Sequence, residues 1–294
     1  MWLHLQMEQT FRHHRITISQ ETSGMTALAF ALNHMAAPGL PVDAFFSLAR
    51  SLGISLVEIR NDLTTNAIAD GTPPEEVKAL AEKHGLTIVS INALQRFNEW
   101  SEERAAEARE LISYARDCGA KALVLVPVND GSGKEDGVRQ TNLRQALAAL
   151  KPMLDAAGVT GLVEPLGFEV CSLRSKAEAA EAIRAVSGQS SFRLVHDTFH
   201  HHLAGEDQFF ADLTGLVHIS GVIDENLAVS DMRDPHRVLV DAADRLDNQG
   251  QIRRLRDEGY AGPFSFEPFA PSVHALADPA DALRESMDYL RSRS

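Results

Sequence analysis

Four acidic or imidazole side chains follow directly on apolar runs in the second half of the sequence. Glu164 stands in GLVEP, Asp197 in RLVHD, His218 in GLVHI and Glu267 in FSFEP. A carboxylate at such a place is poorly solvated, so its charge is costly unless it is paired or bound to a metal. Three carboxylates brought together would also repel one another, and one of them would take up a proton. A divalent cation removes both difficulties, so the pattern predicts a metal centre with these four ligands.

The predicted ligands favour a hard or borderline divalent cation. One imidazole and three carboxylates suit Mn²⁺ best, and they also accept Zn²⁺, Co²⁺ or Mg²⁺. The two cysteines, Cys118 and Cys171, are widely separated and make no disulfide framework. We expect Cys118 to be a small buried apolar residue. This cysteine usage fits a reducing, cytoplasmic location.

A run of histidines follows the predicted ligand Asp197 in the segment VHDTFHHH. His200 completes an Asp-x-x-His pattern with Asp197, so we predict that its side chain faces the site. We expect His201 and His202 to lie in a solvated loop, because connecting segments usually run over the surface.

Short apolar runs recur along the sequence and would position these residues. Near-continuous runs of Val, Ile and Leu are typical of strands that are buried on both faces of a parallel sheet. The eight predicted strands are Ala27–Leu32, Ser55–Ile59, Thr87–Ile91, Ala122–Val126, Thr160–Val163, Phe192–Val195, Gly215–Ile219 and Pro263–Phe266.

Segments with helical spacing lie between the strands. Apolar residues recur at i, i+3, i+4 and i+7 in segments 77–84, 108–115, 136–157, 252–256 and 283–290. A glycine stands where each of several helices gives way to a strand, as left-handed C-caps require. These glycines are Gly53, Gly85, Gly119, Gly158 and Gly259. The repeated joints argue for a repeated βα unit.

Eight strands with intervening helices predict a single (β/α)₈ TIM barrel over residues 25–294. An open doubly wound sheet is the alternative, but its usual glycine-rich first turn is missing from NHMAAPGLP. In a barrel, the C-terminal ends of all strands meet at one face, where active sites form. The predicted ligands, which end the last four strands, would converge there.

The first four strands would bring further polar residues to the same face: Asn33, His34, Glu58, Arg60, Asn92 and Asn129. Among these, we predict that His34, Asn92 and Glu58 contact a substrate. A structural ion pair between Glu58 and Arg60 inside the barrel is the alternative for these two residues.

The N-terminal segment, the net charge and the lack of a long apolar stretch limit the kinds of partner that the protein could bind. Residues 1–24 have no apolar stretch typical of a secretory signal, and we expect an extension outside the barrel, as an upstream start codon would produce. The formal net charge is −13, without a basic cluster, which disfavours nucleic acid and anionic membranes. No apolar stretch approaches the roughly 18 residues of a membrane span. We expect a small polyol or ketose as partner; a homo-oligomer is compatible with the sequence.

The segments VEPLG, VHDTFHHH, VHISG and FSFEP, in this order and spacing, resemble the xylose-isomerase-like TIM barrel family of sugar isomerases and epimerases. The resemblance covers about residues 26–292. Within the family, the segment from His218 through RVLVDAADRLDNQGQIRRLRDEGYAGPFSFEPF resembles the 2-keto-myo-inositol isomerase (inosose isomerase) group of inositol catabolism.

The resemblance implies roles for individual residues. It implies one divalent metal bound by Glu164, Asp197, His218 and Glu267, with the two glutamates as catalytic groups. It places the Asp-x-x-His histidine on His200. The family's substrate-binding arginine falls on Arg237, and Arg233 is a rival in the long loop between Gly221 and His236. The family often has Pro-Gly-x-Gly after this arginine, whereas this sequence has VLVDAADR, which implies a differently shaped pocket.

The function expected from this resemblance is a metal-dependent isomerase of a polyhydroxy ketone. It would convert 2-keto-myo-inositol to 1-keto-D-chiro-inositol by carboxylate proton transfer through a metal-bound enediol. The alternatives in the same fold are a ketose 3-epimerase, a hydroxypyruvate isomerase and an inosose dehydratase. An abasic-site endonuclease is disfavoured by the acidic charge, and measurable turnover would exclude a non-catalytic binding protein. A phosphorylated sugar is disfavoured because PFAPSVH lacks glycines that could present N–H groups to phosphate.

Overall fold

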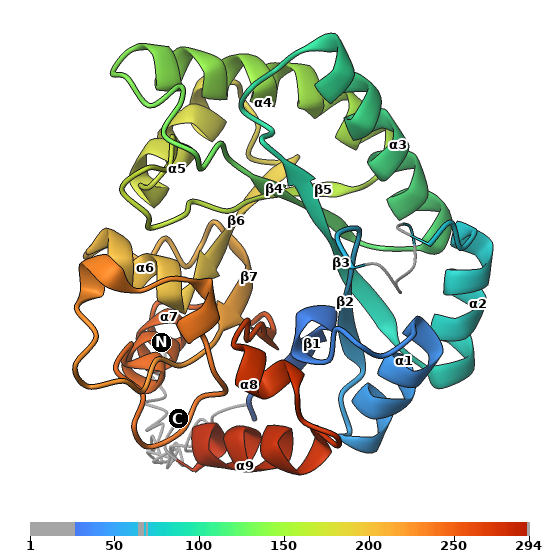
Figure 1. Cartoon of the computed structure of the whole chain (residues 1–294). Helices are drawn as coiled ribbons and strands as arrows, with labels where there is room; N and C mark the ends of the chain where they lie inside the picture. Colours follow the sequence, from blue (N-terminus) through green and yellow to red (C-terminus); the bar gives the residue numbers. More distant parts are fainter. Residues whose placement is uncertain (1–26, 64–67, 69, 293–294) are drawn as a thin grey trace, which may run out of the picture.

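The computed structural model describes residues 27–63, 68 and 70–292. Within them, parallel strands close into one barrel in which each strand pairs with the next in sequence and the last pairs with the first. Figure 1 shows the strands as a ring with the helices around it. The strands are β1 (Phe30–Asn33), β2 (Leu56–Arg60), β3 (Thr87–Gln95), β4 (Ala122–Val126), β5 (Thr160–Val163), β6 (Phe192–Asp197), β7 (Thr214–Ile219) and β8 (Phe264–Phe266). The predicted single (β/α)₈ barrel is confirmed.

The helices connect the strands on the outside of the ring. They are α1 (Val42–Ser51), α2 (Pro74–His84), α3 (Glu102–Cys118), α4 (Val138–Ala157), α5 (Lys176–Ala185), α6 (Thr198–Ala204), α7 (Asn248–Asp257), α8 (Pro271–His274) and α9 (Ala280–Arg291). Short 3₁₀ helices are η1 (His34–Ala36), η2 (Val229–Asp231) and η3 (Asp234–His236). The five glycines predicted at helix ends all have positive φ, between 63° and 99°. These predicted joints are confirmed.

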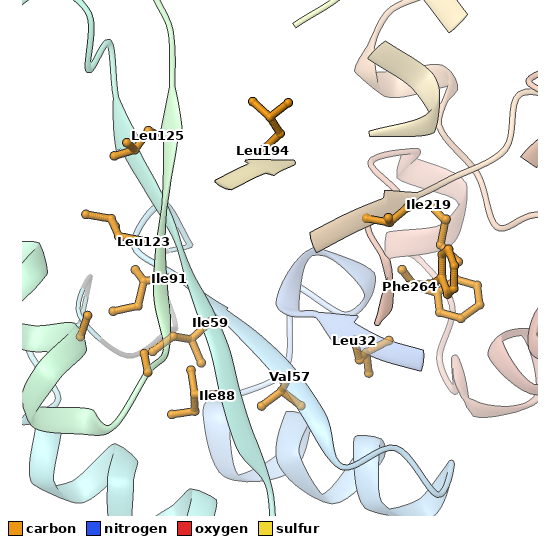
Figure 2. Packing of buried hydrophobic residues seen from close by; sticks show 14 of the residues in the cluster. Leu32, Val57, Ile59, Ile88, Ile91, Leu123, Leu125, Leu194, Ile219 and Phe264 are labelled. Atoms are coloured by element: carbon orange, nitrogen blue, oxygen red, sulfur yellow. The ribbon is translucent and has the colours of Figure 1, made fainter. Parts of the chain in front are cut away.

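The main hydrophobic core lies between the strands and the helices. Strand residues such as Leu32, Val57 and Ile59 are fully buried and pack in one cluster with apolar helix residues such as Phe46 and Leu147. Figure 2 shows labelled strand members of this cluster. Because side chains alternate along a strand, the neighbours of these residues point to the inside of the barrel.

The inside of the barrel is partly apolar and partly polar. A separate small cluster includes Val124, Leu162, Val195 and Leu216, which come from β4 to β7. Two residues after Leu162, Val195 and Leu216 in the chain stand Glu164, Asp197 and His218. The two-residue period therefore places these polar residues directly above the apolar layer, at the C-terminal mouth of the barrel.

Other sequence predictions have simple outcomes. Both Cys118 and Cys171 are buried free thiols, as expected for Cys118, and burial raises the pKa of each to about 11. Among the helices of the described residues, none has the length and apolar composition needed to cross a membrane. The predicted extension at residues 1–24 lies outside the described residues, so it stays a prediction.

Candidate metal centre

The four predicted ligands lie together at the mouth of the barrel. Glu164 follows β5, Asp197 ends β6, His218 lies in β7 and Glu267 follows β8. Each offers one ligand atom, these atoms lie within 4.8 Å of one another, and all four residues are buried. Strands that are far apart in the sequence thus deliver three carboxylates and one imidazole to a single point.

The distances in this group suit coordination of one ion. His218 Nδ1 lies 2.9 Å from Glu164 Oε1, 3.2 Å from Glu267 Oε2 and 3.9 Å from Asp197 Oδ2. Two atoms that are each about 2.1 Å from a shared ion lie roughly 3–4 Å apart in tetrahedral or octahedral geometry. The donor set and its spacing therefore fit a divalent cation, and the four residues could hold one.

Glu58 holds the other side of the His218 ring. Its Oε2 lies 3.2 Å from His218 Nε2, and it accepts hydrogen bonds from Ser90 Oγ at 2.5 Å and Asn92 Nδ2 at 2.7 Å. Ser265 Oγ donates to the other carboxylate oxygen. A carboxylate that accepts the second N–H of an imidazole fixes its tautomer and makes it a stronger ligand. Glu58 therefore leaves Nδ1 of His218 as the nitrogen that faces the carboxylates.

This placement corrects two predictions about Glu58. Glu58 was expected to contact substrate, or to pair with Arg60, but it is fully buried and its partners are His218 and its polar neighbours. Arg60 instead donates to both carboxylate oxygens of Asp62 at 2.8 Å and to Glu267 Oε1 at 2.8 Å. Glu58 thus contacts the candidate ligand His218, and Arg60 contacts the candidate ligand Glu267.

His34 also differs from its prediction as a substrate contact. Its ring stacks on Phe45 of α1, with the centroids 4.1 Å apart, and its Nε2 lies 2.8 Å from the carbonyl oxygen of Leu40. The preceding residue, Asn33, is the one that reaches the site, since its Nδ2 donates to Glu267 Oε1 at 3.2 Å. Side chains alternate in direction at the end of β1, and the short helix η1 begins at His34.

Of the two arginines considered for substrate binding, Arg237 and not Arg233 lies beside the four candidate ligands. Arg237 is buried, and its Nη2 donates to Asp197 Oδ2 at 2.6 Å and to Glu267 Oε2 at 3.0 Å. Its Nε donates to Ser220 Oγ at 3.0 Å, which fixes the guanidinium plane. Arg233 is exposed, and its Nη1 donates to the carbonyl oxygens of Ser230 and Met232.

The buried charges around the ring leave a deficit of positive charge. With His218 neutral, as an imidazole that binds a metal is, Glu164, Asp197, Glu267 and Glu58 carry four formal negative charges, against two positive charges on Arg60 and Arg237. A divalent cation would supply the remaining two charges, and it would do so where desolvation makes unbalanced charge costly. The charge count thus agrees with the geometry.

The two glutamate ligands have different electrostatic surroundings. Burial raises the pKa of Glu164, although His218 acts in the opposite direction. Burial would also raise the pKa of Glu267, but His218, Arg237 and Arg60 outweigh it and hold that pKa well below its usual value. Burial opposes the charged form of His218, yet Glu267, Glu58 and Glu164 raise its pKa well above the usual value.

A small cavity opens above the ligands. It measures about 220 Å³, and its lining includes Glu164 and Glu267 together with the predicted substrate contacts Asn92, His200 and Arg237. Arg60, for which the sequence left substrate contact and a pair with Glu58 as alternatives, also lines the cavity, as does Phe269, which the sequence did not single out. Phe269 lies under both guanidiniums, 5.5 Å from that of Arg60 and 4.6 Å from that of Arg237. Nothing in the sequence around Phe269 marks this role.

The histidine run after β6 is a helix, not the solvated loop that was expected. Asp197 Oδ1 accepts from the backbone N–H groups of Phe199 and His200, so the ligand is also the N-cap of α6. His200 faces the cavity, and its Nδ1 accepts from the Gly167 N–H at 3.2 Å. His201 is buried, 2.8 Å from Lys176 Nζ.

Fold and site together define a class: a (β/α)₈ barrel with a buried carboxylate–histidine group that could hold a metal at the C-terminal ends of its strands. The model of the xylose isomerase-like TIM barrel family matches residues 46–293, and the chain belongs to this family. A search of curated proteins gave no match.

Solved structures agree with this assignment. A xylose isomerase domain-containing protein from Salmonella typhimurium LT2 is 35% identical, with a TM-score of 0.81 over 92% of this chain and 98% of that one. The IolI protein, solved with a zinc atom, is 19% identical, with a TM-score of 0.81 over 91% and 99%. The 3-keto-D-glucoside 4-epimerase from E. coli is 21% identical, with a TM-score of 0.68 over 90% and 99%. The last two share the fold.

Proposed function

We propose that this protein is a divalent-metal-dependent isomerase of a polyhydroxy ketone, and that 2-keto-myo-inositol is its substrate and 1-keto-D-chiro-inositol its product. One observation carries the proposal: two carboxylates with different surroundings, both members of the group that fits a divalent cation, line a small polar cavity. Moving a carbonyl to the adjacent carbon needs a proton acceptor, a proton donor and stabilisation of the enediol between them.

The residues that would hold the cation are Glu164, Asp197, His218 and Glu267. A cation held there would supply Lewis acidity, which draws electron density from a ketone oxygen and makes the neighbouring C–H more acidic. The chain's own residues then have to position the substrate and move the proton. The acidic net charge and neutral donors such as Asn92 suit an uncharged polyol better than an anion, because the two guanidiniums in the cavity wall are already paired with carboxylates.

Glu164 is the better proton acceptor of the two glutamates. Glu267 is fixed by Asn33 and by two guanidiniums, all of which favour its charged form and weaken it as a base. The hydrogen-bond partner of the Glu164 side chain is His218, at 2.9 Å. We therefore assign removal of the C–H proton to Glu164. The carboxylic acid so formed then returns a proton to the former carbonyl carbon, while the hydroxyl proton passes to the former ketone oxygen. In the reverse direction the same carboxyl group returns that proton, since a reaction and its reverse share one path.

Asn92, His200 and Arg237 would orient the substrate. Because His200 Nδ1 accepts a hydrogen bond from Gly167, the proton of a neutral ring is on Nε2, which can donate to a substrate oxygen. Arg237 has one N–H group left on Nη1, which can donate to substrate while Nη2 holds Asp197 and Glu267 in place. Asn92 is tied to Glu58, so it presents its amide in one orientation.

The test is proton exchange in deuterium oxide. The Mn²⁺-loaded protein is incubated with 2-keto-myo-inositol, D-fructose and D-tagatose, and NMR follows deuterium entering each carbon. We expect deuterium beside the carbonyl of the inosose and formation of 1-keto-D-chiro-inositol. Inversion at C3 of a ketohexose, without a product from the inosose, would replace the proposal by a 3-epimerase. Loss of hydroxide would point to a dehydratase, and no exchange into any ketone would refute the proposal.

A further inference from the structure

A second, larger groove continues outward from the cavity above the metal ligands. It measures about 530 Å³, against about 220 Å³ for the inner cavity, and both are lined by Asn129, Phe168 and Asp234. The inner cavity alone is smaller than the roughly 300–1,000 Å³ of ordinary ligand sites, whereas the outer groove lies within that range. The shared lining residues make the two spaces parts of one site.

The walls of this outer groove come from connecting segments at the C-terminal face of the barrel. The segment between β5 and α5 contributes Phe168, Val170 and Arg174, and the segment between β7 and α7 contributes Val229 and Arg233. Such segments carry specificity in barrels, while the strand ends carry the chemistry. The groove is therefore placed to recognise a part of a ligand that lies outside the reacting centre.

The lining of the groove suits a neutral polar ligand that has apolar faces. Arg174 and Arg233 are balanced by Glu169 and Asp234, so the charged lining residues have no formal net charge. A site for phosphate would need an excess of cations or a set of free backbone N–H groups. A sugar ring instead offers hydroxyls to charged and amide groups, and C–H faces to apolar ones.

Both guanidiniums in the groove are braced by carbonyl oxygens. Arg174 donates from Nε to Gly167 and from Nη2 to Leu203, and Arg233 donates from Nη1 to Ser230 and Met232. Each guanidinium has five N–H donors, so donors remain for ligand hydroxyls. A braced guanidinium loses little side-chain freedom when it binds a ligand.

Apolar and accepting groups complete the groove. The Phe168 ring lies at the junction of the two spaces, with its centroid 5.1 Å from that of His200. Val170 and Val229 are 44% and 41% exposed, which is unusual for valine and leaves apolar surface for a sugar face. The buried Oδ1 of Asn129 accepts no hydrogen bond from the described residues, so a ligand hydroxyl could satisfy it.

We propose that the substrate carries a second, neutral sugar unit: the ketone-bearing ring occupies the inner cavity, and the sugar joined to it by a glycosidic bond occupies the outer groove. This inference rests on the proposed ketone isomerase function for the reacting ring. It extends the proposed substrate from the free inosose to polyhydroxy ketones that carry a glycosyl group.

The experiment compares D-fructose with three disaccharides that carry a free fructose carbonyl, namely lactulose, leucrose and isomaltulose. Deuterium exchange by the full-length, Mn²⁺-loaded protein gives kcat/KM for each. We expect at least one disaccharide to exceed fructose by about tenfold or more, because one or two added hydrogen bonds suffice for that ratio. Val229→Trp, which fills the groove, should lower this ratio toward one. Val170→Trp is a second variant with the same expectation.

Val138→Trp is the matched control. Val138 is 47% exposed at the start of α4 and is not part of the groove lining, so the ratio should stay at the wild-type value. Equal kcat/KM for fructose and all disaccharides, with fructose exchange intact, would overturn the inference and leave the proposed function standing. A ratio unchanged in both groove variants would also overturn it.

A binding measurement decides the case in which neither fructose nor a disaccharide exchanges, both when the inosose exchanges and when the proposed function fails. Saturation-transfer NMR reports which ring of isomaltulose touches the protein. Saturation of the glucosyl protons that is lost in Val229→Trp and kept in Val138→Trp would support the groove as a sugar site. Saturation confined to the fructosyl protons, or absent from both rings, would overturn it.

Discussion

At the scale of single residues, the two glutamate ligands differ in what surrounds them. Glu267 is held by Asn33, Arg60 and Arg237, while Glu164 contacts the imidazole of His218. This asymmetry is the basis for the different roles that we propose for two groups that are equivalent by sequence pattern. A strand-end glutamate after an apolar run looks the same in both places, and only the cations contributed by β2 and by the β7–α7 segment separate them.

Glu164→Gln removes the proton acceptor at nearly constant volume. We expect kcat with saturating metal to fall by about 10²- to 10⁴-fold, the usual loss for general acid–base catalysis. Glu267→Gln should lower both kcat and metal affinity, since it also unpairs two guanidiniums. Glu181→Gln, on the exposed side of α5, is the control and should keep the wild-type rate. A fully metallated Glu164→Gln that works at the wild-type rate would refute the assignment, as would a fully metallated Glu267→Gln with unchanged kcat.

Glu58→Gln tests the support of His218. In the wild type, the negative charge of Glu58 orients the His218 imidazole and makes it more basic. The variant lacks this charge, so we expect metal affinity to fall by about 10- to 100-fold. Competition with a chelating dye measures this affinity, and the melting temperature of the metal-free variant shows whether it is folded. Unchanged affinity in a folded variant would mean that Glu58 does not support the ligand. Glu181→Gln again serves as the control for loss of a carboxylate.

At the scale of elements, a buried polar cluster joins α5, β6, α6 and α7 behind the site. Lys176 is 3% exposed, and its Nζ lies 2.9 Å from His196 Nδ1 and 2.8 Å from His201 Nδ1. His196 Nε2 lies 2.8 Å from Gln251 Oε1. The cluster fixes β6 and α6, and the ligand Asp197 lies between them.

Stability should depend on pH through Lys176. Burial is the largest cause that lowers its pKa, to about 7, from a usual value of 10.5. Below pH 7 the folded and unfolded chains both carry the proton, and the folded chain bears the full cost of a buried charge. Between about pH 7 and 10.5 the unfolded chain binds more protons than the folded chain, so the free energy of unfolding rises with pH, by at most about 5 kcal/mol in total.

The measurement is denaturant unfolding of the wild type and Lys176→Met at pH 7 and pH 10. The free energy of unfolding of the wild type should rise relative to that of the variant as the pH increases. Lys78→Met, on the exposed face of α2, controls for the loss of a lysine charge. A difference between wild type and Lys176→Met that stays constant or shrinks toward pH 10 would contradict the account.

Most of these elements could be predicted from the sequence, and the exceptions have a physical reason. All eight strands and the glycine joints could be predicted, because apolar periodicity and positive φ are local properties. The helix α6 was missed, since polar HHH suggests a loop and the cap by Asp197 depends on where β6 ends. The true partners of Glu58 could not be predicted either. They lie on β3, β7 and β8, and only the closed barrel brings them together.

At the scale of the whole molecule, closure of the barrel creates the site. β1 pairs with both β2 and β8, so the strand order is complete within the described residues. The same closure brings Asn33 and Arg60, from the start of the chain, against Glu267, from its end. The convergence of the four candidate ligands could be predicted from sequence because they obey one rule, that polar residues at strand ends meet at one face.

A chain that starts at Met25 tests the role of the first 24 residues. Because the described strands β1 to β8 close the barrel by themselves and β1 begins at Phe30, we expect the shortened protein to fold and to keep full activity. Its melting temperature and its rate with 2-keto-myo-inositol are compared with those of the full chain. An insoluble or inactive product would show that the extension is part of the domain.

The central claim, a metal centre formed by Glu164, Asp197, His218 and Glu267, is tested most directly by metal content. The purified chain is stripped with a chelator, reloaded with Mn²⁺ or Zn²⁺, dialysed and analysed by elemental analysis, in parallel with His218→Ala. We predict about one ion per chain in the wild type and a clear loss in the variant, because the imidazole faces all three carboxylates. A reloaded wild type without stoichiometric metal, or a variant that retains as much as the wild type, would contradict the account.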